Sequence, residues 1–87
     1  MYVIIVYDVA PKRGVKVLKF LRQYLTWVQN SVFEGEITES VFEVIKSGLK
    51  SLINKEKDSI IYYKFDSKNY TDRKVIGIER NDTDTFI

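Results

Sequence analysis

A carboxylate ends the most apolar stretch of the sequence and is the first group that could do chemistry. In the opening segment MYVIIVYDVAPKRG, Asp8 follows a continuous apolar and aromatic run, and Pro11, Lys12 and Arg13 come close behind it. The chain contains no histidine, so a divalent ion is the most plausible means of activating water to hydrolyse a phosphodiester. Magnesium takes hard oxygen ligands and keeps several waters, so one or two carboxylates suffice. Asp8 is therefore the candidate metal ligand.

Asp8 also has a purely structural interpretation, because Asp is common in turns and as the cap of a following helix. As a metal ligand, a single carboxylate is a poor site by itself. A two-fold axis near the strand ends would bring Asp8 of two subunits together and supply two carboxylates from one sequence position. The residues alone leave both interpretations open.

Positive charge is concentrated behind Asp8. The segment before Phe33 contains five basic residues and one acidic residue. The rest of the chain contains nine basic residues and eleven acidic ones. The candidates for phosphate contact are Lys12, Arg13, Lys16, Lys19 and Arg22. Such contacts are independent of base sequence and sensitive to salt. The pattern favours a polyanionic partner, and an ordinary solvated helix face is the alternative.

The elements that must position these groups follow from the apolar pattern. Residues 2–7 predict a central strand that is buried on both faces. The next apolar residues have helical spacing and predict an amphipathic first helix: Val17, Leu18, Leu21, Tyr24, Leu25 and Val28. Residues 27–37 predict either two short strands joined by a reversal or one bent strand with a bulge.

A second amphipathic helix is predicted next. Thr38 or Ser40 can cap it, with Ser40 and Glu43 at the spacing of a capping box, and the helix ends near Asn54. Two further strands are predicted at residues 58–65 and 74–79.

This order of elements is typical of an α+β fold, the ferredoxin-like βαββαβ sandwich. We expect a single domain over residues 1–87 with an extra C-terminal edge strand. The sequence ends in Phe86 and Ile87, so we expect the tail, about residues 80–87, to dock on a partner subunit or another protein.

The core of so short a chain is modest, and without cysteine no disulfide can reinforce it. We therefore expect a homodimer, formed sheet against sheet because the predicted strands carry apolar residues on both faces. No run approaches the roughly 18 apolar residues of a membrane span, and no secretory signal pattern is visible. We expect a cytoplasmic protein with no membrane partner.

Several segments, in order and at matching spacing, resemble the CRISPR-associated endonuclease Cas2 family: MYVIIVYDV, VQNSVFEGEIT, DSIIYYKF, IGIE and the terminal FI. The resemblance implies a ferredoxin-like homodimer that acts in spacer acquisition beside the CRISPR integrase. It also implies endonuclease activity that depends on Mg²⁺ or Mn²⁺, on RNA, single-stranded RNA included, or on duplex DNA.

The resemblance carries residue roles with it. The implied catalytic set is Asp8, Tyr7, Ser31 and Phe33, with Asp8 as the metal-binding aspartate. Arg13 or Lys16 takes the family's basic position behind the first strand, and Ser31 and Phe33 match positions near the dimer cleft. Trp27 is a departure, because some members with ribonuclease activity carry Arg there.

Three functions stay open on the sequence. The first is the metal-dependent endonuclease with paired Asp8 residues, and the second is a non-catalytic dimeric scaffold that binds duplex DNA and bridges integrase dimers. The third is a toxin-type messenger RNA interferase on the related fold, because fold does not determine function. A platform for stacking single-stranded bases competes with core packing for the aromatic residues Tyr2, Tyr7, Tyr24, Phe33, Tyr62 and Tyr63.

Overall fold

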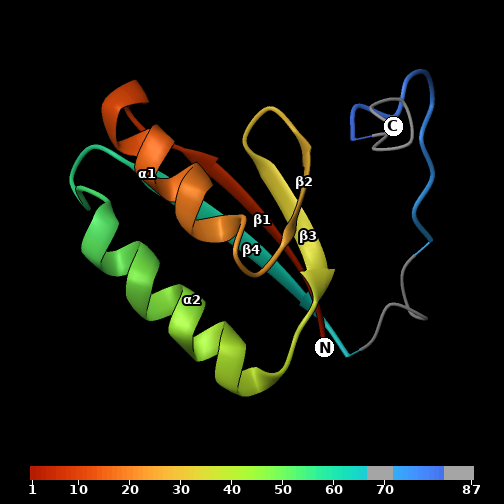
Figure 1. The fold of residues 1–87 in the computed structure, drawn as a ribbon, viewed down its shortest axis with the longest axis horizontal. Coiled ribbons are helices and arrows are strands. Elements are labelled where there is room, and N and C mark those ends of the chain that lie inside the picture. Colours follow the sequence, from red (N-terminus) through yellow and green to blue (C-terminus); the bar gives the residue numbers. More distant parts are fainter. Residues whose placement is uncertain (67–71, 82–87) are drawn as a thin grey trace.

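A four-stranded sheet with β1 at its centre organises the molecule. The computed structural model describes residues 1–66 and 72–81. Along the chain the elements are β1 (Tyr2–Asp8), α1 (Pro11–Leu21), β2 (Thr26–Gln29), β3 (Val32–Glu36), α2 (Glu39–Leu52) and β4 (Ser59–Phe65). The strand order is β2-β3-β1-β4 with antiparallel neighbours throughout. Both helices lie on the same side of the sheet (Figure 1), as the ferredoxin-like fold predicts.

The core lies between the helices and one face of the sheet. Val3, Ile5 and Tyr7 alternate along β1 and belong to the buried cluster. The largest fully buried side chains are Phe33, Phe42, Ile5, Leu21, Ile45, Val3 and Val17. Each buried side chain of this size stabilises the fold by about 1.5–3 kcal/mol. The helices approach closely, because the ring of Phe20 occupies the space that any side chain at Gly48 would need.

The first helix is shorter than its apolar spacing predicts. It ends at Leu21, and Val28 lies in β2. Leu25, which the periodicity placed on the helix, is instead buried beside Gly35, with its Cδ2 3.0 Å from where a Cβ atom at that glycine would stand. The spacing of these residues fits a helix equally well, but pairing with β3 gives the backbone from Thr26 onwards its hydrogen-bond partners.

The second helix begins directly after Thr38, the first of its two predicted caps and two residues before Ser40 of the predicted capping box. Thr38 is the N-cap, and its hydroxyl accepts a hydrogen bond from the Val41 amide at 3.1 Å. Ser40 lies inside the helix, so the Ser40 alternative is wrong, and the last helical residue is Leu52.

The segment between the helices contains both features that the sequence offered as alternatives. β2 and β3 form a hairpin, and the register shifts between Trp27 and Gln29, which marks a bulge. Asn30 turns the chain with a φ of 45°, a left-handed conformation that Asn adopts more readily than most residues.

The strand predicted at residues 74–79 is absent from the described part of the chain, where β4 is the last strand. Ile76 and Ile78 are 102% and 72% exposed, and neither sheet edge pairs with this segment. Arg73 anchors it instead, through ion pairs to Glu34 at 2.6 Å and Glu79 at 2.9 Å. A strand needs a neighbouring backbone, which the segment does not find here. The predicted docking residues Phe86 and Ile87 lie outside the described residues.

Candidate functional site

Asp8 stands at the open end of the central strand. It is the last residue of β1, is exposed, and lies opposite Ser59 of β4. Side chains alternate along a strand, and Val3, Ile5 and Tyr7 belong to the core beside the helices. Asp8 therefore belongs to the other set, on the sheet face that the helices leave uncovered. Among residues 1–66 and 72–81 its carboxylate makes no hydrogen bond or ion pair.

The capping role proposed for Asp8 is not observed. The N-cap of α1 is Ala10, whose side chain cannot cap, and Pro11 starts the helix. Proline suits this position because it lacks the N–H that would need a partner. Asp8 is thus left available for an external ligand.

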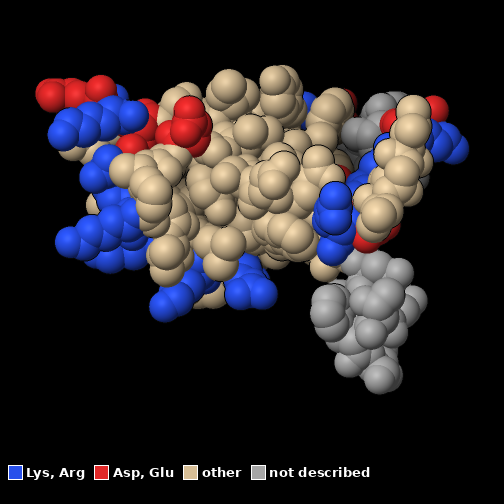
Figure 2. Space-filling view, turned by 90° about the horizontal axis from the view of Figure 1, so that it is seen from above, with Lys and Arg blue, Asp and Glu red and all other residues tan. Residues whose placement is uncertain are grey.

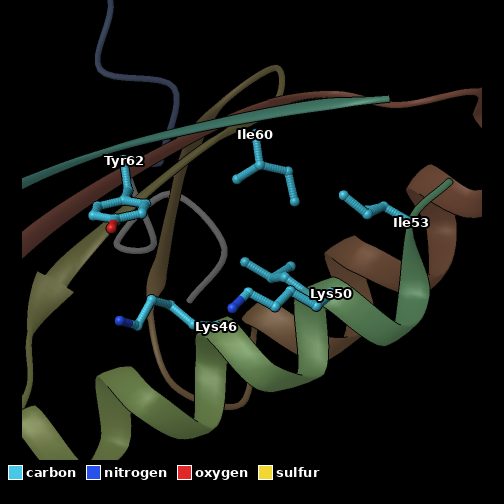
Figure 3. Close-up of a pocket in the computed structure, with 6 residues that line it drawn as sticks. Lys46, Lys50, Ile53, Ile60 and Tyr62 are labelled. Carbon is cyan, nitrogen blue, oxygen red and sulfur yellow. The ribbon is translucent and has the colours of Figure 1, made fainter. Parts of the chain in front are cut away.

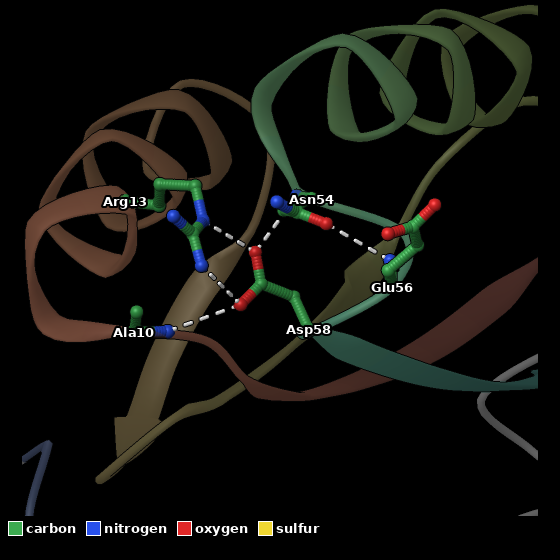
Figure 4. A network of polar contacts seen from close by, with 5 residues as sticks. All are labelled: Ala10, Arg13, Asn54, Glu56 and Asp58. Atoms are coloured by element: carbon green, nitrogen blue, oxygen red, sulfur yellow. Dashed lines mark hydrogen bonds and ion pairs between the residues drawn. The ribbon is translucent and has the colours of Figure 1, made fainter.

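A different aspartate secures the start of α1. Asp58, just before β4, accepts hydrogen bonds from the Ala10 amide at 3.2 Å and from the Asn54 amide at 2.8 Å. Arg13 binds the same carboxylate with two nitrogens, Nε at 2.6 Å and Nη2 at 2.9 Å. Figure 4 shows these contacts converging on one carboxylate, with Ala10 and Arg13 at the start of α1 on one side and Asn54 of the loop after α2 on the other. Asp58 therefore connects α1 to the α2–β4 loop.

The electrostatics of this pair follow from its contacts. The Asp58 side chain is 1% exposed. The hydrogen bond from Arg13 holds the pKa of the Asp58 carboxyl far below its usual value, against the opposing effect of desolvation, and the backbone amides add to the lowering. The same contact raises the pKa of Arg13. Arg13 was predicted to contact phosphate, but the structure places it in this intramolecular pair.

The sequence could not reveal this role, because Arg13 and Asp58 are 45 residues apart. The only local signal is the segment NKEKDS, where an Asp follows a helix end in a turn-forming context.

The other predicted catalytic residues gather at the same end of the sheet but are inward-facing or lie in the turn. Tyr7 is 7% exposed and stacks on Phe33 with a centroid distance of 6.3 Å. Burial raises the pKa of the Tyr7 phenol, and a hydrogen bond with the Ser31 side chain opposes the effect. The Ser31 main-chain oxygen accepts from the Tyr7 amide at 3.0 Å. Phe33 is fully buried, so it supports the site from behind and does not reach a ligand.

The remaining basic residues form an open surface, here called the α1 basic strip: Lys12, Lys16, Lys19 and Arg22. All four are exposed, and none forms an ion pair within the described ranges. Lys and Arg side chains gather on the side of the molecule that carries α1 (Figure 2). The strip begins a few residues behind Asp8, which suits contact with a phosphate backbone.

A groove lined by two lysines lies between α2 and β4, apart from the α1 basic strip. It has a volume of about 290 Å³ and is lined by Lys46, Leu49, Lys50, Ile53, Ile60 and Tyr62. Figure 3 shows the two lysines on the helix and Tyr62 on the strand facing this space. Lys46 is ion-paired with Glu43 at 3.0 Å, and nearby Lys64 with Glu39 at 3.6 Å. Acidic neighbours therefore offset part of the positive charge around this groove. The α1 basic strip has no such acidic partners in the described ranges.

No cluster of three or more potential metal ligands occurs among the described residues. Asp8 is the candidate ligand at this end of the sheet, and its side chain is exposed. Its hard oxygen atoms fit a magnesium-type ion, but a complete site needs ligands from water, from substrate or from a second chain. Neither described helix is long and apolar enough to cross a membrane.

Together, the fold and this site define a ferredoxin-like α+β protein in which an exposed carboxylate ends the central strand and a basic helix follows it in the sequence. The family model for the CRISPR associated protein Cas2 matches residues 1–73, so the chain belongs to the Cas2 family. This membership confirms the resemblance and decides against the toxin-type interferase.

Similar proteins and solved structures support the same family assignment. The CRISPR-associated endoribonuclease Cas2 of Dictyoglomus turgidum is 52% identical over 93% of either chain. Its namesake in Pyrococcus furiosus is 51% identical over the full length of both. A crystal structure of cas2 superimposes with a TM-score of 0.84 at 43% identity, covering 93% of this chain and 91% of that one. The crystal structure of Streptococcus pyogenes Cas2 superimposes with a TM-score of 0.78 at 34% identity, covering 88% of this chain and 100% of that one.

Proposed function

We propose that this protein is an endoribonuclease of a CRISPR system, with Asp8 as a metal ligand at the reacting phosphodiester. The single observation that carries the proposal is the Asp8 carboxylate, which is exposed and makes no hydrogen bond or ion pair among residues 1–66 and 72–81. The α1 basic strip begins four residues further along the sequence. The endoribonuclease names of the relatives favour this enzyme over the non-catalytic scaffold.

We further propose that two copies pack through the sheet face that the helices leave open. The residues of β4 that alternate onto this face, Ile61 and Tyr63, are 51% and 53% exposed. Ile4 and Val6 lie opposite Tyr63 and Ile61 in the register of β1 and β4, so they extend the same apolar surface. Asp8 is the last residue of this set along β1. A two-fold axis near it would place two Asp8 side chains together.

In this proposal the chain's own residues bind and orient the substrate. The α1 basic strip holds the phosphate backbone, independently of base sequence. Asp8, with its counterpart in the second copy, holds a Mg²⁺ or Mn²⁺ ion. When bound, such an ion lowers the pKa of its water and balances the charge that develops on the phosphate. Tyr7, stacked on Phe33, keeps the end of β1 rigid.

The proposed setting includes partners that stay predictions: the CRISPR integrase and duplex DNA, with the α1 basic strip as the surface for the latter. The cytoplasmic location also stays a prediction. Docking of the tail, about residues 80–87, concerns residues most of which the structure does not describe.

The experiment compares wild type and Asp8→Asn on end-labelled single-stranded RNA and duplex DNA, each with Mg²⁺ or with chelator. We expect RNA cleavage by the wild type with Mg²⁺ only. The variant should lose about a hundredfold or more, since even residues that only support metal ligands contribute about 10–100-fold. Binding of RNA in chelator should be similar for both proteins. Metal-dependent cleavage by a folded Asp8→Asn variant at the wild-type rate would refute the catalytic role.

A further inference from the structure

A pocket that the proposed chemistry does not use lies beside the β2–β3 hairpin. Its volume is about 400 Å³, within the range of about 300–1,000 Å³ typical of small-molecule sites. Among the residues that the structure describes, its lining consists of Trp27, Gln29, Asn30 and Arg80. The first three come from the hairpin, and Arg80 comes from the segment after residue 72, which runs on the hairpin side of the molecule (Figure 1).

The lining combines planar groups with unused hydrogen-bonding groups. The Trp27 indole is held at its edge, where Nε1 donates to the Asn30 main-chain oxygen at 3.0 Å. The side-chain amides of Gln29 and Asn30 and the Arg80 guanidinium make no hydrogen bond or ion pair within residues 1–66 and 72–81. Aromatic rings and guanidinium planes stack on bases, and side-chain amides pair with base edges.

The pocket lies at the end of the sheet that carries Asp8. Val6 of β1 faces Val32 of β3, and the Tyr7 amide donates to the Ser31 oxygen. Asn30 and Asp8 are the next residues outward along the two antiparallel chains. A nucleotide bound in the pocket would therefore lie at the same end of the molecule as the proposed reaction.

We propose that this pocket binds one unstacked nucleobase of single-stranded RNA, stacked on Trp27 and contacted by Arg80, with the Gln29 and Asn30 amides at its polar edge. The proposal rests on the proposed function, because it assigns the pocket to the substrate of the Asp8 site. The groove between α2 and β4 is the weaker candidate, since Glu43 pairs with one of its two lysines at 3.0 Å.

The test uses the fact that Trp27 is the only tryptophan in the chain. Its emission is followed in chelator, so that no cleavage occurs, while ten-nucleotide homopolymeric RNAs are added. Base stacking on the indole should quench the emission saturably. A blunt RNA duplex, whose bases are already stacked, should bind with much less quenching. Labelled RNA measures total affinity in parallel by anisotropy.

Arg80→Ala is compared with Lys74→Ala, which removes one positive charge from the same segment but does not line the pocket. Arg80→Ala should weaken single-strand binding about fivefold or more, and Trp27→Ala about tenfold. Lys74→Ala should match the wild type. Asn30→Gly permits the positive φ and removes the amide, so it gives a readout if Trp27→Ala fails to fold.

Saturable quenching that is reduced in Arg80→Ala supports the pocket. RNA that binds and is cleaved without quenching overturns the pocket and leaves the proposed function intact. Equal effects of Arg80→Ala and Lys74→Ala would also overturn it. Absence of both RNA binding and cleavage would refute the proposed function itself, which is a different result.

Discussion

Asp8 and Asp58 lie at neighbouring strand ends, yet the structure uses them in opposite ways. Asp8 ends β1 with an exposed side chain and no partner in the described ranges. Asp58, one residue before β4, has a side chain that is 1% exposed and accepts four hydrogen bonds from Ala10, Arg13 and Asn54. Asp8 lies opposite Ser59, the residue after Asp58, across the β1–β4 pair. The two carboxylates are therefore close in the sheet and differ in what surrounds them.

The difference separates a residue that stabilises the fold from one available for chemistry. A buried carboxylate with satisfied oxygens cannot take a new ligand without losing its present partners. An exposed carboxylate without partners contributes little to stability and can bind a metal ion. The same contrast divides the basic residues, since Arg13 is engaged by Asp58 and the α1 basic strip is not.

The largest contrast should appear in the activity of the folded protein. Asp8→Asn should lose about a hundredfold or more in metal-dependent RNA cleavage. Asp58→Asn, assayed at a temperature where circular dichroism shows it folded, should keep cleavage within a few-fold of the wild type, because the Asp58 oxygens are already engaged by groups of the chain itself. Equal losses in the two folded variants would break the division of roles.

Thermal stability should show the reverse contrast. Asp58→Asn leaves Arg13 without its charged partner and should lower the melting temperature by roughly 10 °C. Asp8→Asn should leave it within about 2 °C, as expected for an exposed residue without contacts. Differential scanning calorimetry measures both, and an unchanged melting temperature for Asp58→Asn would contradict the structural role.

The stabilising effect of Asp58 should depend on pH. Its carboxyl pKa is depressed in the folded state relative to the ordinary 3.8. The unfolded chain therefore takes up the proton first, and the stabilisation is complete above that value and lost as pH falls below it. The stability difference between wild type and Asp58→Asn should stay constant from about pH 8 to pH 5 and narrow below about pH 4. Urea unfolding of both proteins across this pH range measures the difference in their free energies of unfolding. A difference that grows as the pH falls below 4 would contradict the depressed pKa of Asp58.

The smallest contrast is expected among the basic residues. Lys16→Ala with Lys19→Ala should weaken RNA binding and reduce the slope of log affinity against log salt by about 1–2. Arg13→Ala should mainly lower the melting temperature and leave the slope almost unchanged. Lys46→Ala with Lys50→Ala, on the other helix, is the matched control. A slope reduced as much by Arg13→Ala as by the double variant would return Arg13 to the nucleic-acid surface.

The order of elements and the family could be predicted from the sequence because they depend on local signals. The apolar run of β1 and the amphipathic α2 each carry their periodicity within a few residues. The end of α1 could not be predicted in the same way. Leu25 and Val28 keep helical spacing, and only the pairing of β2 with β3 decides that they leave the helix.

The candidate site divides along the same line. Asp8, at the end of an apolar strand, and the basic residues of α1 could be identified as candidates from the sequence, because adjacency along the chain defines both. The packing of the fold was needed to show that Arg13 binds Asp58 and that Trp27, Gln29, Asn30 and Arg80 line one pocket. Contacts between residues about 50 positions apart depend on how strands and loops pack, and no local pattern encodes that distance.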